Sequence, residues 1–361
     1  MRRKEGVMRY VKIAMAAIAV LHLFGEEMRA AEAPASTYSI TDLGSLGGGR
    51  TSPMGINNRG AVVGFSATVD GLTRAFLYTG GSLVDLGTLG GDESFAYRIN
   101  DNGIIVGRAQ DSSGRFRAFM TTIGGARGIE LTSLDPRVDG DFSAALGVNS
   151  VGEVTGYYTT AGDHMSARNR VLFYHDSRVE DLGTFGGEDG RVVAVNNGRS
   201  MVGFFSSEPH ADYAQHRSFL STGGKLVPIG SLGGQLTTAR DLNSRNEVVG
   251  DGDAGHGAHH AFLFAGGTLR DLGTLAGGLQ SAAYGINERG DIVGFSEGSD
   301  HSARAVIVTA GVMRDLNGLI PSGSGWVLTE ARDINDAGRI VGTGWRDGEQ
   351  RGFLLTPTDD E

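Results

Sequence analysis

Short apolar segments alternate with turns rich in glycine and asparagine along almost the whole chain. Four signals return in a fixed order at a spacing of about forty-five residues, which is typical of repeat proteins built from small units. The signals are a DLG-type run, a segment ending in Asn, a VVG-like run ending in Gly, and an AFLY-like run. Each run is short and β-prone, so each unit predicts four β-strands.

The link between the second and third signals is the most regular part of the unit. An Asn stands seven residues before a Gly in all seven units, and five units carry another Gly at the third position after the Asn. The remaining two have Asn246 and Arg199 at that position. Asn can accept hydrogen bonds from the backbone of its own turn, and Gly or Asn can adopt the left-handed conformation of a bulged hairpin. We therefore interpret the repeated asparagines as turn formers rather than ligands: Asn57, Asn100, Asn149, Asn196, Asn243, Asn287 and Asn335.

A unit of four short strands cannot bury both faces of its sheet, so neighbouring units must stack, and closing the stack into a ring removes its free ends. Residues 38–44 form a lone DLG strand, whereas the last unit, residues 329–356, has the other three strands. The sequence therefore predicts an all-β fold, a seven-bladed β-propeller of four-stranded blades over residues 38–356. An N-terminal strand would complete the last blade. An open β-solenoid is the alternative, and it would not need complementary ends.

The N-terminal segment follows another pattern. Three basic residues at positions 2–4 precede an apolar stretch that runs from about Val11 to Phe24, and small residues follow. This plan predicts a secretory signal over residues 1–33 and a secreted or periplasmic protein. An uncleaved anchor is the alternative, but the stretch contains Lys12 and His22, and a span needs about 20 apolar residues. We expect no membrane span after cleavage, and residues 357–361 form a short acidic tail.

Composition narrows the class of protein. The 59 glycines and 40% apolar residues suit many short strands joined by tight turns. The formal net charge is −10, and an acidic protein has no general attraction for phosphate backbones, so we expect no binding of nucleic acid. The chain has no Cys, which excludes disulfides and cysteine nucleophiles, so blade packing must supply the stability.

The combined pattern of D-L-G-x-L-G-G, I-N-x-x-G-x-V-V-G and a basic residue before A-F resembles the extracellular HAF repeat family. The His-Ala-Phe that gives this family its name stands here at residues 260–262, and Arg takes the place of His in most other copies. The resemblance covers residues 38–356. It implies a repeat fold and export, and it implies no activity, because the family is defined by its repeats and export and has no established activity.

A basic residue stands immediately before the fourth strand of every unit. A ring of such cations could hold an anionic ligand by bidentate contacts. The alternative is a structural ion pair with the acidic residue of a DLG-type run, and the presence of such a residue in all but one of the units favours it. The basic residues are Arg74, Arg117, Arg170, Arg217, His260, Arg304 and Arg351. Their expected partners are Asp42, Asp85, Glu130, Asp181, Asp271 and Asp315.

Most histidines fall in one kind of connection, between the VVG-like and AFLY-like runs of units three to six. In a propeller this connection shares a face with the Leu-Gly-Gly loops that follow the DLG runs, so we expect a ligand-binding face there. The histidines are His164, His210, His216, His256, His259, His260 and His301.

The densest histidine cluster spans residues 250–260. Its imidazole and carboxylate groups are a weak candidate site for a divalent transition metal, formed by Asp251, Asp253, His256 and His260. Solvated loop histidines are the alternative, because no spacing in the cluster matches a defined metal motif. No other cofactor is indicated.

These observations favour an exported binding or interaction module that recognises a glycan, a peptide or a protein partner outside the cytoplasm on the histidine-rich face. The first alternative is a polysaccharide hydrolase or lyase on a propeller scaffold, and the second is a structural envelope protein. No catalytic motif is present, so an enzyme is not the leading hypothesis. We expect a monomer.

Overall fold

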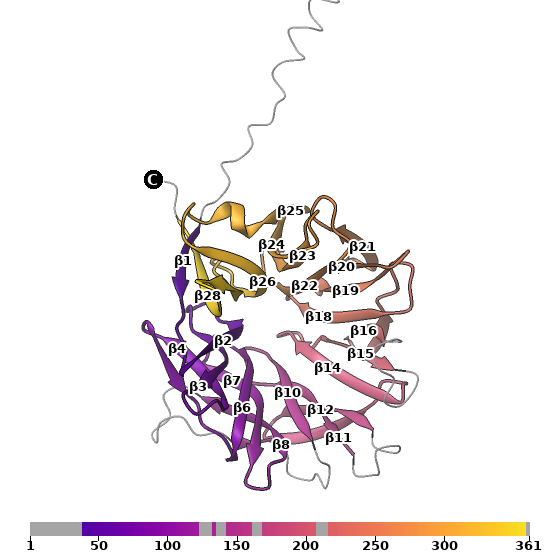
Figure 1. Cartoon of the computed structure of the whole chain (residues 1–361). Coiled ribbons are helices and arrows are strands. Elements are labelled where there is room, and N and C mark those ends of the chain that lie inside the picture. The colour runs from indigo at the N-terminus through magenta and orange to yellow at the C-terminus, as the bar shows by residue number, and fades with distance from the viewer. Residues whose placement is uncertain (1–37, 123–131, 135–141, 161–167, 207–215, 359–361) are drawn as a thin grey trace, which may run out of the picture. The chain divides into compact units, whose positions relative to one another are not determined.

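The computed structural model describes residues 38–122, 132–134, 142–160, 168–206 and 216–358. In this part of the chain, seven four-stranded antiparallel sheets stand side by side around a central channel, as Figure 1 shows. Each sheet is one blade, so the predicted seven-bladed β-propeller is confirmed. Among the described residues, no helix is long and apolar enough to cross a membrane.

The strands of each blade follow one another in chain order from the channel outward, and the last blade differs by taking its outer strand from the N-terminus. Blade 1 consists of β2 (Gly47–Ile56), β3 (Val62–Thr68), β4 (Thr73–Thr79) and β5 (Ser82–Asp85). Blade 2 consists of β6 (Gly90–Ile99), β7 (Ile104–Asp111), β8 (Phe116–Thr122) and β9 (Thr132–Ser133). Blade 3 consists of β10 (Ser143–Val148), β11 (Val154–Thr159), β12 (Asn169–His175) and β13 (Arg178–Gly183).

Blades 4 to 6 repeat this order. Blade 4 consists of β14 (Asp189–Val195), β15 (Met201–Ser206), β16 (His216–Thr222) and β17 (Lys225–Pro228). Blade 5 consists of β18 (Thr237–Leu242), β19 (Val248–Gly255), β20 (Ala258–Ala265) and β21 (Thr268–Gly273). Blade 6 consists of β22 (Ser281–Ile286), β23 (Ile292–Glu297), β24 (Ala303–Thr309) and β25 (Val312–Asp315). Blade 7 consists of β26 (Trp326–Ile334), β27 (Ile340–Arg346), β28 (Glu349–Pro357) and β1 (Tyr38–Asp42). A 3₁₀ helix, Leu316–Leu319, follows β25.

The N-terminal strand closes the ring as predicted. Strand β1 pairs with β28 in antiparallel register, from Tyr38 opposite Pro357 to Asp42 opposite Phe353. Tyr38 is buried in the core of the last blade, and Ile40 packs against the same cluster. The two ends of the repeat region therefore form one sheet, which leaves no unpaired blade.

The core repeats with the blades. The Phe of the AFLY-like run is fully buried in five blades, and burial of one such side chain stabilises the fold by about 1.5–3 kcal/mol. These residues are Phe76, Phe119, Phe219, Phe262 and Phe353. The Gly that ends each VVG-like run makes room for the inner strand: a Cβ on Gly107 would lie 2.0 Å from the carbonyl oxygen of Phe95. Only Gly permits this close approach.

Each inner strand contains a β-bulge at the same place, three residues before the repeated Asn. In β6, Ala96 pairs with Gly107 and Arg98 pairs with Val106, so that Tyr97 has no partner on β7. The same shift occurs in all seven inner strands. A bulge redirects side chains locally. Here it lets two consecutive residues, Tyr97 and Arg98, both face the channel.

The repeated asparagines shape the turns that follow the inner strands, as predicted. In the first turn the Asn57 Oδ1 accepts hydrogen bonds from the amides of Arg59 (3.1 Å) and Ala61 (2.9 Å). The two positions that lack Gly adopt the left-handed conformation all the same, with φ of 57° at Arg199 and 60° at Asn246.

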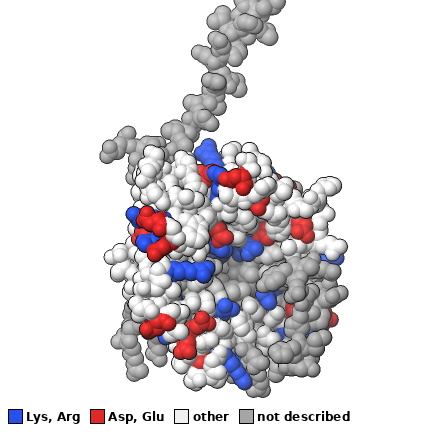
Figure 2. Space-filling view, viewed as in Figure 1, with Lys and Arg blue, Asp and Glu red and all other residues white. Residues whose placement is uncertain are grey.

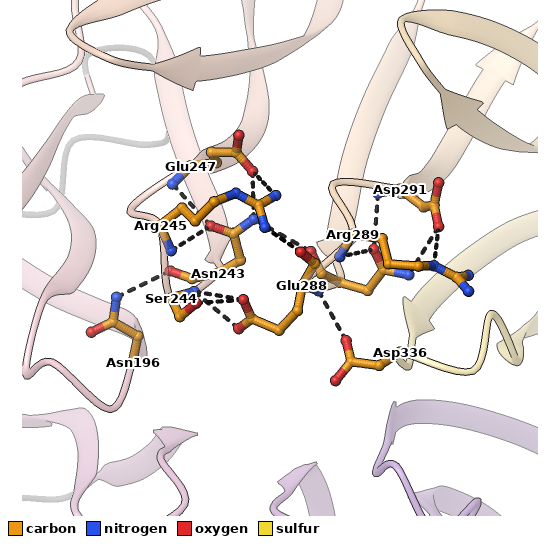
Figure 3. Close-up of polar contacts among 10 residues, drawn as sticks. Asn196, Asn243, Ser244, Arg245, Glu247, Glu288, Arg289, Asp291 and Asp336 are labelled. Atoms are coloured by element: carbon orange, nitrogen blue, oxygen red, sulfur yellow. Dashed lines mark hydrogen bonds and ion pairs between the residues drawn. The ribbon is translucent and has the colours of Figure 1, made fainter.

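The same asparagines also join the blades, which the turn pattern did not indicate. The Nδ2 of each donates to the main-chain carbonyl oxygen of the repeated Asn in the next blade, over 2.7–3.3 Å. The bond from Asn335 to Asn57 closes the circle at 3.0 Å. Figure 3 shows two of these turns, where the next residues add Ser244–Glu288 and Glu288–Asp336 contacts. We call this circle the asparagine ring.

Candidate functional site

A cavity of about 430 Å³ occupies the channel on the side where the inner strands begin, away from the asparagine ring. Figure 2 shows basic side chains around a hollow near the middle of one face of the molecule. We call this space the channel cavity. The bulges supply much of its wall, with one residue from each inner strand: Met54, Tyr97, Leu146, Val193, Arg240, Tyr284 and Arg332.

Arginines stacked on tyrosines dominate the polar part of the wall. The guanidinium carbon of Arg332 lies 4.5 Å from the ring centre of Tyr284, and that of Arg240 lies 5.0 Å from the same ring. Across blades 3 and 4, the guanidinium of Arg191 lies 4.5 Å from the ring centre of Tyr157. Such stacking fixes the planes of the guanidinium groups and leaves their N–H edges available to a ligand.

Two of these arginines are neutralised by carboxylates. Arg240 pairs with Asp251, and Arg332 pairs with Glu330. Arg191, by contrast, forms no ion pair with any described residue. Within the described part of the chain, the wall therefore keeps one cation without an ion pair, in a protein whose formal net charge is −10.

Asp251 is the centre of a small charged network at the edge of the channel cavity. His259 contacts it through Nε2 at 2.7 Å and contacts Asp253 through Nδ1 at 3.2 Å. Burial alone would raise the pKa of Asp251, but the hydrogen bond with His259 and the charge of Arg240 lower it overall. The hydrogen bond with Asp251 in turn raises the pKa of His259. Asp251 is therefore held as a carboxylate and is unsuited to donate a proton.

The tyrosines and His216 have shifted acidities as well. Burial raises the pKa of Tyr97 to about 12, and burial also raises the pKa of Tyr284, so both phenols stay protonated at neutral pH. Burial, followed by the charge of Arg191, lowers the pKa of His216, and this histidine is uncharged at neutral pH. Its ring stacks on Phe204 with 4.5 Å between the ring centres.

A layer of buried charges forms the floor of the channel cavity. Arg98 donates through Nη1 to the carbonyl oxygen of Met54 (3.1 Å), and its Nη2 lies 3.9 Å from Asp241 Oδ1. Asp333 accepts a hydrogen bond from the amide of Ile56 at 2.9 Å. Burial raises the pKa of Asp241 to about 6 and also raises that of Asp333. This charged floor separates the channel cavity from a second hollow of about 230 Å³ at the asparagine ring.

The described histidines that were predicted to form a ligand-binding face do not all lie together in the structure. His216 lines the channel cavity, and His259 reaches it through Asp251. His256 and His301 are exposed at left-handed positions, and His260 points to the outer strand of its blade, 2.9 Å from Asp271. His164 and His210 lie outside the described residues.

The candidate metal ligands do not come together in the described part of the chain. No group of three or more His, Asp or Glu side chains there is placed to hold a metal ion. The reason is the alternation along β20: His259 turns toward Asp251 and Asp253, whereas its neighbour His260 turns toward Asp271. The predicted set of Asp251, Asp253, His256 and His260 is therefore divided between different surroundings.

The repeated basic residue before each fourth strand has the predicted structural role in four blades. The pairs are Arg170–Asp181 at 2.7 Å, His260–Asp271 at 2.9 Å, Arg304–Asp315 at 3.1 Å and Arg351–Asp42 at 2.9 Å. In blade 2, Arg117 pairs with Asp111 of the neighbouring strand instead, at 3.0 Å. Glu130 lies outside the described residues, and Arg74 does not pair with Asp85 within them. The exposed Arg217 has no acidic residue in the DLG-type run of its unit.

Sequence reasoning missed the residues that line the channel cavity. A signal was available, because the residue three positions before each repeated Asn varies widely in size and charge, while the residue just before it is small or apolar in every unit. Tyr97, Arg240, Tyr284 and Arg332 all occupy that position. Repeats conserve what holds the blades together, so the positions that vary between copies are the ones free to serve a ligand.

The fold and this site define the chain as a seven-bladed β-propeller with an arginine- and tyrosine-lined cavity in its channel. No family model matches the sequence, and no curated protein matches it either. The resemblance to the HAF repeat family therefore stays a prediction.

Solved structures share the fold. A puromycin-hydrolyzing peptidase of Mycobacterium tuberculosis is 14% identical and superposes with a TM-score of 0.57, over 90% of this chain and 55% of that one. An acylaminoacyl peptidase is 9% identical with a TM-score of 0.56, over 90% and 52% of the two chains. An oligogalacturonate lyase in complex with manganese is 12% identical with a TM-score of 0.53, over 83% and 86%. The chain thus spans about half the length of the peptidases, and the likeness concerns the fold alone.

Proposed function

We propose that the protein is an exported binding module that holds an anionic group of a glycan, peptide or surface partner in the channel cavity. The observation that supports this most directly is Arg191, which lies flat on Tyr157 at the cavity wall and has no carboxylate partner among the described residues. Guanidinium groups bind carboxylates and other oxyanions through two parallel hydrogen bonds. A stacked, unpaired guanidinium is ready to form them.

The electrostatics of the cavity support the same proposal. Arg98, Arg191, Arg240 and Arg332 line it, and among the residues that the structure describes Asp251 is the one carboxylate that does. A concave site with an excess of one charge concentrates ligands of the opposite sign. Export is supported by the basic and then apolar N-terminal pattern.

A second candidate function is a polysaccharide hydrolase or lyase, and His216 favours it. An imidazole that is uncharged at neutral pH can accept a proton, and Arg191 nearby could neutralise a carboxylate of the substrate. The other titratable groups of the cavity are unsuited to proton transfer at neutral pH: Asp251 stays ionised in its ion pair, and Tyr97 and Tyr284 stay protonated. These groups make binding the leading proposal.

The test is a panel of acidic and neutral polysaccharides and peptides, measured by isothermal titration calorimetry and by analysis of products after incubation. Arg191→Gln should weaken binding of acidic ligands at least about tenfold, because it removes a charge-assisted pair. Arg217→Gln is the matched control, since Arg217 is exposed in the same blade, and it should bind as the wild type does. Product formation by the wild type would favour the enzyme, and equal binding by both variants would contradict the proposed site.

A further inference from the structure

A row of aromatic rings runs across blades 1 to 3 and ends at the channel cavity. Successive ring centres lie 5.1, 5.8, 6.0 and 5.5 Å apart. The rings come from β3, β6, β8, the residue before β10, and β11, and every one of them is partly exposed. In order, they are Phe65, Phe95, Phe116, Phe142 and Tyr157. Tyr157 also lines the channel cavity, so the row and the cavity are continuous.

A guanidinium group lies in the middle of this aromatic row. The guanidinium carbon of Arg108 is 4.6 Å from the ring centres of Phe95 and Phe116 and 5.2 Å from that of Phe142. Its Nε is buried and makes no hydrogen bond within the described part of the chain, and no described carboxylate pairs with it. Arg191 stands in the same way on Tyr157 at the cavity end of the row.

A comparison of equivalent positions in different blades shows that aromatic rings are not needed to pack this part of a blade. Blade 5 has Asp251 at the position equivalent to Arg108, and His259 at the position equivalent to Phe116. Those two residues form an ion pair instead of an aromatic cluster. The propeller therefore builds the same part of a blade without aromatic rings, and a contiguous row of partly exposed rings usually marks a binding surface.

We propose that the aromatic row is an extended binding site for a polysaccharide that carries carboxylates on successive sugars. Sugar rings would stack on the aromatic faces, whose spacing is comparable to the length of one pyranose ring, and the carboxylates would pair with Arg108 and Arg191. This inference rests on the proposed function, in which the channel cavity binds an anionic group, and it adds the class and the length of the ligand.

A glycan fits the row better than a peptide does. One common way in which a peptide binds a β-sheet is by pairing with an unpaired strand edge. The strands that carry Phe65, Arg108 and Tyr157, however, are the second strands of their blades, and each is hydrogen-bonded to a strand on both sides. The row offers ring faces and guanidinium groups, which suit stacked, charged sugars.

The test compares ligands of different length by isothermal titration calorimetry with the whole protein. The probes are mannuronate, its trimer and its hexamer, with mannose oligomers of the same linkage as uncharged controls. The wild type should bind the mannuronate hexamer at least about tenfold more tightly than the monomer, and it should bind the mannose hexamer weakly.

Variants separate the row from the cavity. Phe65→Ala, at the far end of the row, should weaken binding of the hexamer several-fold and leave binding of the monomer unchanged, whereas Arg191→Gln should weaken both. Arg108→Gln should act as Phe65→Ala does. Phe295→Ala, at the position equivalent to Phe65 in blade 6, is the matched control and should keep the preference for the hexamer. Thermal melts identify any variant that fails to fold. The comparison of ligand lengths with the wild type tests the proposal even if a variant does not fold.

Each other result overturns the inference in a recognisable way. If the wild type binds monomer and hexamer equally, or if Phe65→Ala binds the hexamer as the wild type does, the row is not part of the site, and the proposed function stands. If a glutamate hexapeptide binds and the mannuronate hexamer does not, the ligand is an acidic peptide. If no anionic probe binds at all, the proposed function fails together with the inference.

Discussion

The floor of the channel cavity places two carboxylates beside one guanidinium. The charge of Arg98 acts to lower the pKa of both Asp241 and Asp333, and both also accept main-chain hydrogen bonds. Burial disfavours the charged form of both carboxyl groups, so their pKa values are raised in spite of these contacts. The propeller therefore keeps a proton in its channel at pH values where an exposed carboxyl group has lost it.

This proton makes stability depend on pH. Asp241 keeps its proton up to a pKa of about 6 in the folded state, but an unfolded Asp loses it near about 3.9. Between these values the folded state binds more protons, so the free energy of unfolding falls as pH rises. We expect Asp241→Asn to flatten this fall between about pH 4 and 6, because Asn needs no proton and keeps the acceptor for the Ile286 amide.

Urea unfolding at a series of pH values measures this effect. Asp333→Asn should flatten the remaining slope, and the double variant should show the smallest dependence on pH in this range. His259→Asn is the control: the raised pKa of His259 also makes stability fall with rising pH, but at pH values above the ordinary histidine pKa of about 6.5. An unchanged slope in Asp241→Asn would show that this carboxyl group titrates normally.

Among the secondary-structure elements, the bulge of each inner strand determines which side chains reach the channel. Alternation along a regular strand would place Tyr97 and Arg98 on opposite faces. The bulge turns both toward the channel, and the same holds for Arg240 and Asp241 in blade 5. A single unpaired residue in each blade thus adds to the side chains that a narrow channel can present.

The turn after each inner strand carries more stability than a surface turn does. Asn100→Ala should lower the free energy of unfolding by about 2–4 kcal/mol, because it removes the bonds that Asn100 accepts from the amides of Asn102 and Ile104 and the one that it donates to Asn149. Asn102→Ala is the matched control. Its side chain forms one exposed bond, with the carbonyl oxygen of Ser150, and its loss should cost less than about 0.5 kcal/mol. Equal urea midpoints for the two variants would contradict a role for the asparagine ring.

The sequence predicts these elements better than it predicts their side-chain directions. Asn57 and its copies mark the turns because turn chemistry is local, and Oδ1 finds its partners within four residues. The bonds from Nδ2 cross to the next blade, and no local pattern contains them. The bulge is also invisible to periodicity, so Tyr97, Arg240 and Arg332 could be located only once the strands were paired.

For the whole molecule, closure of the ring by the N-terminal strand is the feature that the sequence predicted most completely. The prediction came from complementary ends, which any closed repeat must have, and the pairing of β1 with β28 confirms it. The candidate site was beyond the same reasoning, because Tyr157 and Arg191 come from different blades and meet only when those blades stack. What repeats in the chain reveals the scaffold, and what differs between copies lines the candidate site.

Closure also predicts where the molecule is vulnerable. Deletion of residues 38–45 should lower the melting temperature by about 10 °C or more, since it removes the β1–β28 ladder and takes the buried side chains of Tyr38 and Leu43 out of the core. Ile40→Asp should act in the same direction because Ile40 packs on the core, whereas Ser39→Asp, on the exposed side of β1, should melt with the wild type. Differential scanning calorimetry measures these melting temperatures. An unchanged melting temperature of the deletion variant would mean that β1 does not stabilise the closed ring.

The asparagine ring has a further consequence for how such molecules change over generations. Every joint uses the same donor and the same acceptor, and the donors all point the same way around the axis. A blade that is duplicated or lost by recombination between repeats would therefore meet a compatible neighbour on each side. The number of blades can therefore change in evolution without a new kind of contact between blades. A change in the number of blades alters the width of the channel and the size of ligand that fits.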